Sequence, residues 1–174
     1  TLAAAAEPIV SVLNDTAVGS AAYLGQANSL DYTLTSPIAD VTKVAANFQA
    51  TDTGVTGLPL PLALGVVLDH GTAHAFASFP VNGTSVDNAA STTNGASATL
   101  HITSNTLDST TITVRVQHSA DDATWVDLIV FPTFSGASTA KIATATGTVN
   151  RYLRVRLEEA GGSSGALTLT VASA

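Results

Sequence analysis

The chain has 174 residues and a net charge of −7, and only 11% of its residues are charged, against about 25% in a typical soluble domain. It contains no Cys, which excludes disulfides and thiolate metal sites. The acidic balance argues against sequence-specific nucleic-acid binding, and no apolar run reaches the roughly 18 residues of a membrane span. With 26 Thr and many Ala, Ser and Gly, the surface should pack against neighbours at little desolvation cost. The composition therefore suits an assembly subunit, and equally an ordinary secreted domain.

The N-terminal half predicts a few strands with other segments between them. Four strands are expected from apolar, β-branched runs: Ile9–Leu13, Ala21–Gly25, Val41–Ala50 and Gly65–His70. Residues Ala27–Thr35 are expected to form a turn or a short helix, and two prolines exclude a central strand over Leu58–Leu62. This half has few strands for its length. We expect it to be the end of a β-domain whose earlier strands precede Thr1 or come from a neighbouring subunit.

The C-terminal half alternates apolar and polar residues in short runs between turns. This period of two predicts strands with one inward and one outward face over Ala98–Thr103, Ile112–Val116, Trp125–Phe131, Leu153–Glu158 and Leu167–Val171. The polar stretch 82–95 is expected to be a linker or a long loop. We predict an all-β chain with a boundary near Phe79–Pro80, which gives a β-rich assembly segment (1–79) and an antiparallel β-sandwich, Ig-like or jelly-roll-like (80–174).

Acidic residues dominate the first of these segments. Its single basic residue, Lys43, faces six acids, which are Glu7, Asp15, Asp31, Asp40, Asp52 and Asp69. If subunits enclose passing DNA, an acidic lining would repel phosphate. Solvated acids on ordinary loops explain the same count.

The four histidines do not predict a metal site. His70 and His74 have the spacing of zinc ligands on a helix, but Gly71 lies between them and their context is strand and loop. His101 is expected on the outward face of its strand and His118 at a strand end. We expect satisfied surface or strand-end histidines rather than metal ligands.

No catalytic or cofactor-binding constellation is present either. The Gly-x-Ser-x-Gly nucleophile elbow is missing, and turn chemistry explains Asp121 and Asp122, which with Asp127 lack the spacing of a calcium loop. Glu158 and Glu159 are expected to be solvated. The run 161–165 lacks the Lys and the helix of a phosphate-binding loop. We therefore expect no catalytic, metal-binding or cofactor-binding residues, and no enzymatic activity.

Two features can be interpreted either as structural elements or as sites of interaction with other molecules. Trp125, the only Trp, begins an apolar run and is expected to be a core anchor rather than a stacking platform for carbohydrate. Arg154 and Arg156 share a strand face, so they could pair with acids of a neighbouring subunit. The alternative is a solvated face.

Three C-terminal stretches carry a resemblance to a known family. They are residues 83–95, with Gly83-Thr84-Ser85-Val86-Asp87-Asn88; residues 116–128, with Asp121-Asp122-Ala123-Thr124-Trp125; and residues 147–155, with Asn150-Arg151-Tyr152-Leu153-Arg154. The chain resembles the C-terminal part of major tail proteins of bacteriophages infecting actinobacteria. The similarity covers about residues 80–160 and extends more loosely back to about residue 20.

The resemblance implies a structural virion protein. In that family a tube-forming β-domain precedes an outer β-sandwich, and subunits form homo-oligomeric rings, expected to be hexameric, which stack around a DNA channel. It implies a place in the phage tail, assembly in the host cytoplasm, and partners among other tail or capsid proteins. A complete protein of this kind has more residues before Thr1, so a capsid decoration protein is an alternative. A carbohydrate-binding module that contacts a host-surface glycan is the other.

Overall fold

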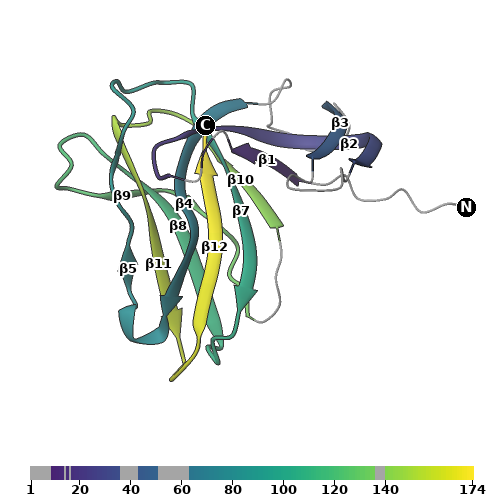
Figure 1. The fold of residues 1–174 in the computed structure, drawn as a ribbon. Helices are drawn as coiled ribbons and strands as arrows, with labels where there is room; N and C mark the ends of the chain where they lie inside the picture. Colours follow the sequence, from purple (N-terminus) through teal and green to yellow (C-terminus); the bar gives the residue numbers. More distant parts are fainter. Residues whose placement is uncertain (1–8, 14, 16, 36–42, 51–62, 136–139) are drawn as a thin grey trace, which may run out of the picture.

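The chain is all-β and forms two antiparallel sheets in a computed structural model, which describes residues 9–13, 15, 17–35, 43–50, 63–135 and 140–174 (Figure 1). The large sheet has the order β1-β2-β4-β12-β7-β10, and β3 pairs with β2. Its strands are β1 (Ile9–Leu13), β2 (Ala21–Thr35), β3 (Lys43–Ala50), β4 (Ala63–Ala75), β7 (Ala96–Asn105), β10 (Ala140–Ala145) and β12 (Ala166–Ser173).

The small sheet has the order β5-β11-β8-β9, and β6 pairs with β11. Its strands are β5 (Val81–Asn82), β6 (Val86–Asp87), β8 (Thr111–Ser119), β9 (Val126–Val130) and β11 (Tyr152–Ala160). A single 3-10 turn, Phe76–Ser78, links β4 to the small sheet. It is the one helical element in the part of the chain that the structure describes, and it is far too short to cross a membrane.

One hydrophobic core lies between the two sheets, which together form what we call the two-sheet body. Alternate residues of four central strands supply most of it: Ala98, Leu100 and Ile102; Ile112, Val114 and Val116; Leu153, Val155 and Leu157; and Leu167, Leu169 and Val171. Each of these side chains is at most 3% exposed, and full burial of such an aliphatic side chain contributes about 1.5–3 kcal/mol. The alternation predicted from sequence is therefore what creates the core.

Strand β4 belongs to the same body, although it precedes the boundary predicted near Phe79–Pro80. It pairs with β12 along most of its length, and Leu68 is 1% exposed in the core. The large sheet thus contains residues from both sides of that position.

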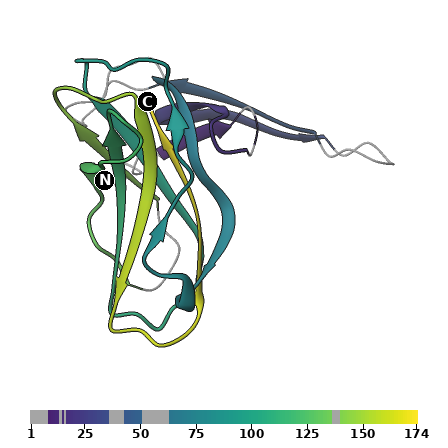
Figure 2. The same ribbon diagram turned by 90° about the vertical axis from the view of Figure 1, so that its left-hand side faces the viewer.

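Strand β2 leaves the body and continues into a two-stranded ribbon. Its first residues, Ala21–Leu24, pair with β4, and residues 22–26 pair with β1. Among the described residues, the remaining part of β2, residues 27–35, pairs only with β3. In both views this β2–β3 ribbon projects sideways from the two-sheet body (Figures 1 and 2).

The ribbon corrects one prediction from sequence. Residues Ala27–Thr35 are not a turn or helix but strand, because cross-strand pairing with β3 overrides a weak local preference. Strand β10, which sequence alone did not indicate, forms at the edge of the large sheet against β7. The run Leu58–Leu62 lies outside the described residues.

Candidate functional site

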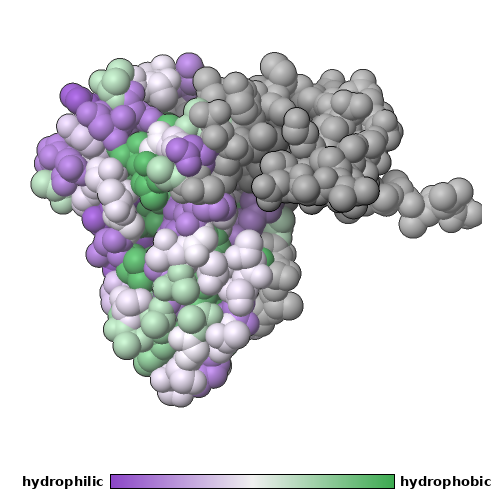
Figure 3. All heavy atoms as spheres, viewed as in Figure 1, coloured by the Kyte–Doolittle hydropathy of each residue, from purple (hydrophilic) through white to green (hydrophobic). Residues whose placement is uncertain are grey.

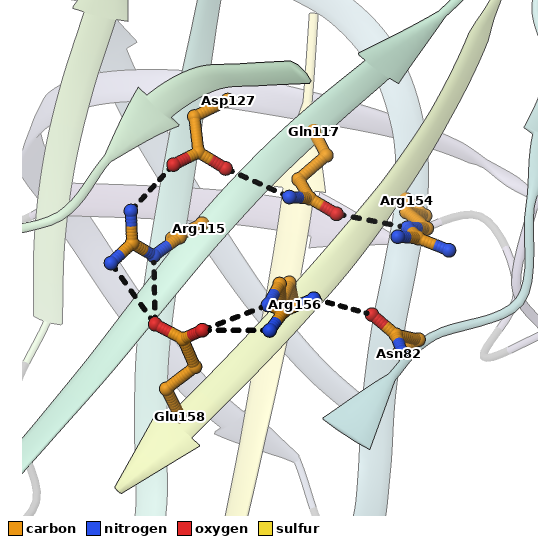
Figure 4. Close-up of polar contacts among 7 residues, drawn as sticks. All are labelled: Asn82, Arg115, Gln117, Asp127, Arg154, Arg156 and Glu158. Atoms are coloured by element: carbon orange, nitrogen blue, oxygen red, sulfur yellow. Dashed lines mark hydrogen bonds and ion pairs between the residues drawn. The ribbon is translucent and has the colours of Figure 1, made fainter. Parts of the chain in front are cut away.

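All four arginines of the chain gather on the small sheet. Arg115 lies on β8, Arg154 and Arg156 lie on β11, and Arg151 immediately precedes β11. Alternate residues of a strand share a face, and the inward positions between them hold the core. The outward positions form what we call the arginine face (Figure 4), made up of Asn82, Arg115, Gln117, Asp127, Arg154, Arg156 and Glu158.

Glu158 holds two arginines that would otherwise repel each other. Arg156 and Arg115 are directly opposite in the β11–β8 register, and like charges in that position are destabilising. Glu158 Oε2 accepts from Arg115 Nη2 at 3.0 Å, and its Oε1 accepts from Arg156 Nη2 at 2.9 Å. The carboxylate therefore neutralises both guanidinium groups at once.

Asp127 on β9 is the second carboxylate partner of Arg115. It accepts hydrogen bonds from Arg115 Nη1 and, at 2.8 Å, from Gln117 Nε2. Partial burial opposes ionisation of Asp127, but these bonds outweigh it and lower its pKa. The bond to Asp127 raises the pKa of Arg115 in turn.

Arg154 is held differently from the other arginines. Its Nε donates to Gln117 Oε1 at 3.0 Å, and its guanidinium carbon lies 4.2 Å from the centre of the Trp125 ring. Within the described residues it forms no direct ion pair, unlike Arg115, Arg151 and Arg156. Desolvation, followed by repulsion from Arg156, lowers the pKa of Arg154, and the negative charge of Asp122 offsets part of this.

Trp125 is therefore not the core anchor expected from the sequence. It is partly exposed, lies just before β9 and packs against Arg154 rather than in the core. Arg156 forms an ion pair with Glu158 inside the subunit, and its pairing with an acid of a neighbouring subunit stays a prediction. Of the two arginines singled out from the sequence, only Arg154 keeps an unpaired charge within the described residues.

At the rim of the sheet, Arg151 and Asp87 form a two-pronged ion pair. Both nitrogen–oxygen distances are 2.6 Å, and the hydrogen bonds from Arg151 lower the pKa of Asp87. Arg151 also lies 5.1 Å from the centre of the Tyr152 ring. Its charge is satisfied within the subunit.

We expect Glu158→Gln to lower the free energy of unfolding by about 1–2 kcal/mol, because two opposed arginines would lose their shared counter-charge. Chemical denaturation at low and high salt would measure it, and the loss should shrink as salt screens the repulsion.

Asp122→Asn is the matched control. It removes the same charge from an exposed residue that forms no direct ion pair in the described part of the chain and acts on Arg154 only through its charge. Its left-handed backbone (φ 57°) suits Asn. A control change below about 0.5 kcal/mol is expected. Equal losses in both variants would mean that Glu158 acts only through net charge.

The histidines do not come together. His70 Nδ1 lies 2.9 Å from Thr170 Oγ1, and His74 Nε2 lies 2.8 Å from Asp69 Oδ2. Among the described residues, no three His, Asp or Glu side chains could hold a metal ion. The structure thus brings His74 to Asp69, a buried pair that sequence spacing did not indicate.

Two polar groups on β7 are buried without partners. Thr99 is 0% exposed, and neither its Oγ1 nor Nε2 of His101 has a hydrogen-bond partner. Burial lowers the pKa of His101. His118, at the end of β8, accepts a hydrogen bond from the Asn150 amide at 3.1 Å.

Three further acids of the two-sheet body, Asp108, Asp121 and Glu159, bind groups in turns. Asp121 accepts from the amides of Ala123 and Thr124, and Asp108 accepts from both serines of the 161–165 turn. These bonds lower the pKa of both carboxyls. Glu159 accepts from Ser109 and from the Gly162 amide rather than being only solvated.

One acid of the N-terminal half, Asp69, is placed where it could not repel DNA. Asp69 is 5% exposed and bonded to His74, so it cannot line a channel. Burial raises its pKa, against the effect of His74. Glu7, Asp40 and Asp52 lie outside the described residues.

Two open hollows lie away from the Trp125–Arg154 stack. One, of about 360 Å³, lies beside Phe79, Thr113 and Glu158. The other, of about 410 Å³, lies beside Gly65 and Ser173, near the base of the ribbon. No protein-family model, curated protein or solved structure matches the chain.

Proposed function

We propose that the chain is a structural virion protein, a tail-tube subunit of a bacteriophage that assembles into stacked homo-oligomeric rings around the DNA channel. In this proposal the two-sheet body is an outer β-sandwich of the Ig-like or jelly-roll kind. The feature that carries the proposal is the β2–β3 ribbon.

The ribbon is a poor structure for an isolated subunit. An unsupported two-stranded hairpin is marginally stable in water, and in the part of the chain that the structure describes residues 27–35 pair only with 43–50. Within the described residues β3 pairs with no strand besides β2, so among these residues its other edge has no strand partner. Such an edge is a template for pairing with another chain. A neighbouring subunit would supply the missing strand and the missing packing.

The surface chemistry supports the same proposal. In the view of Figure 3 the lower part of the two-sheet body is covered mostly by residues of intermediate hydropathy, with strongly hydrophilic residues gathered higher up. A face with few charges can be covered by a neighbour without stripping water from ions. The low overall charge and the ribbon thus favour the same role.

Electron microscopy of the purified chain, with sedimentation over rising protein concentration, tests the proposal. Rings or tubes with a central channel are expected. A variant in which residues 30–47 are replaced by Asn-Gly, which makes a tight two-residue turn, should not assemble, while its circular dichroism and unfolding midpoint stay close to those of the wild type.

Other outcomes would overturn the proposal. Assembly only on isolated capsids would favour decoration, and a monomer that binds glycans on an array would favour the carbohydrate-binding alternative. A ribbon-shortened chain that assembles as well as the wild type would remove the ribbon from the argument.

A further inference from the structure

Arg154 presents a partly desolvated positive charge that is preorganised to bind an anion. Trp125 and Gln117 fix the guanidinium through its face and its Nε. Its two terminal nitrogens make no hydrogen bond within the described residues. Because the side chain is already ordered, little conformational entropy would be lost when a ligand binds.

A carboxylate is the ligand that fits this geometry. A guanidinium offers two parallel N–H donors that match the two oxygens of a carboxylate. Burial and the neighbouring charge of Arg156 both lower the pKa of Arg154, which means that both disfavour its charged form. The charge of an incoming carboxylate would offset both effects.

The surroundings of Arg154 favour a protein partner. Trp, Tyr and Arg are the residues that dominate binding energy at protein interfaces. Trp125 stacks on Arg154, and Tyr152 lies two residues before Arg154 on β11. Next to them, Val126 and Val130 are 55% and 48% exposed on β9. Within the described residues β9 pairs with no strand besides β8, and β10 of the large sheet lies near it.

Charge identifies the partner as a second copy of this chain. The arginine face has three arginines and two carboxylates, whereas the whole chain has a net charge of −7. The excess of negative charge therefore lies on other parts of the chain, and a second copy would present it to this face. A positive face cannot complement itself, so the contact must join two different surfaces, as in rings and stacks.

We infer that Trp125 and Arg154 form the centre of a head-to-tail contact in which Arg154 binds a carboxylate on the acidic surface of a second copy. This inference rests on the proposed assembly and deepens it. It assigns the contact to the small sheet, separately from the ribbon.

The test compares Arg154→Gln with Arg151→Gln by sedimentation velocity over a range of concentrations and salt. Both variants lose one positive charge, but Arg151 is paired with Asp87 inside the subunit. Arg154→Gln should raise the concentration needed for assembly by about tenfold or more, and Arg151→Gln by less than about threefold. Arg154→Lys, which keeps the charge but not the fork, should recover only part of the loss.

The outcomes separate this inference from the proposed function. If the Arg154→Gln variant forms tubes as readily as the wild type, the inference is overturned and the tail role still stands. Small oligomers that need Arg154 but never form rings would support the inference and overturn the tail role. A wild type that stays monomeric, or an Arg154-dependent binding of uronate glycans without self-association, would overturn the second-copy contact.

Discussion

Phe131→Ala is expected to lower the free energy of unfolding by about 3–5 kcal/mol. Phe131 directly follows β9, is 1% exposed and is among the largest fully buried side chains. Its amide donates to the Val114 carbonyl at 3.0 Å, so the backbone stays in place when the ring is removed. The cavity then cannot close easily, and domains of ordinary stability have only about 5–15 kcal/mol in total.

Val130→Ala is the matched control, because Val130 is the preceding residue and is 48% exposed. This substitution should change the free energy of unfolding by no more than about 0.5 kcal/mol. Guanidinium denaturation followed by circular dichroism would measure both. If both substitutions lowered the free energy of unfolding by similar amounts, Phe131 would not be a main part of the core between the two sheets.

The central strands were predictable because their period-two pattern is the direct cause of the core. Leu153, Val155 and Leu157 alternate with polar residues and are all buried, as the sequence indicated. Strand β10 was not predictable, since Ala140–Ala145 is a small edge strand defined by its pairing with β7. The same holds for residues 27–35, whose strand conformation depends on β3.

The candidate site was predictable only in part. Strand parity placed Arg154 and Arg156 on one face, but parity does not give the register between strands. The register brings Arg115 opposite Arg156 and makes Glu158 their shared partner. It also places Trp125 beside Arg154, which no pattern within a single strand could indicate. These cross-strand contacts decide which arginine stays unpaired.

Gly165→Ala is expected to destabilise the chain by about 3–5 kcal/mol. Gly165 has a φ of +98° in the turn before β12, and a Cβ there would lie 2.1 Å from the Thr106 carbonyl oxygen. The backbone cannot retreat cheaply, because the Gly165 carbonyl accepts from the Phe76 amide at 2.9 Å and the Thr106 amide donates to Ala166 at 2.9 Å. Moving either segment would break a bond that joins β12 to its neighbours.

Gly147→Ala separates the clash from the backbone strain. Gly147 has nearly the same φ, +94°, but a Cβ there would meet nothing within 4 Å. It should cost only the left-handed strain, about 1–2 kcal/mol. The difference between the two variants, measured by denaturation, therefore isolates the contact with Thr106. If Gly147→Ala were as damaging as Gly165→Ala, strain alone would explain both, and the close approach of the two turns would not be what holds this end of the body together.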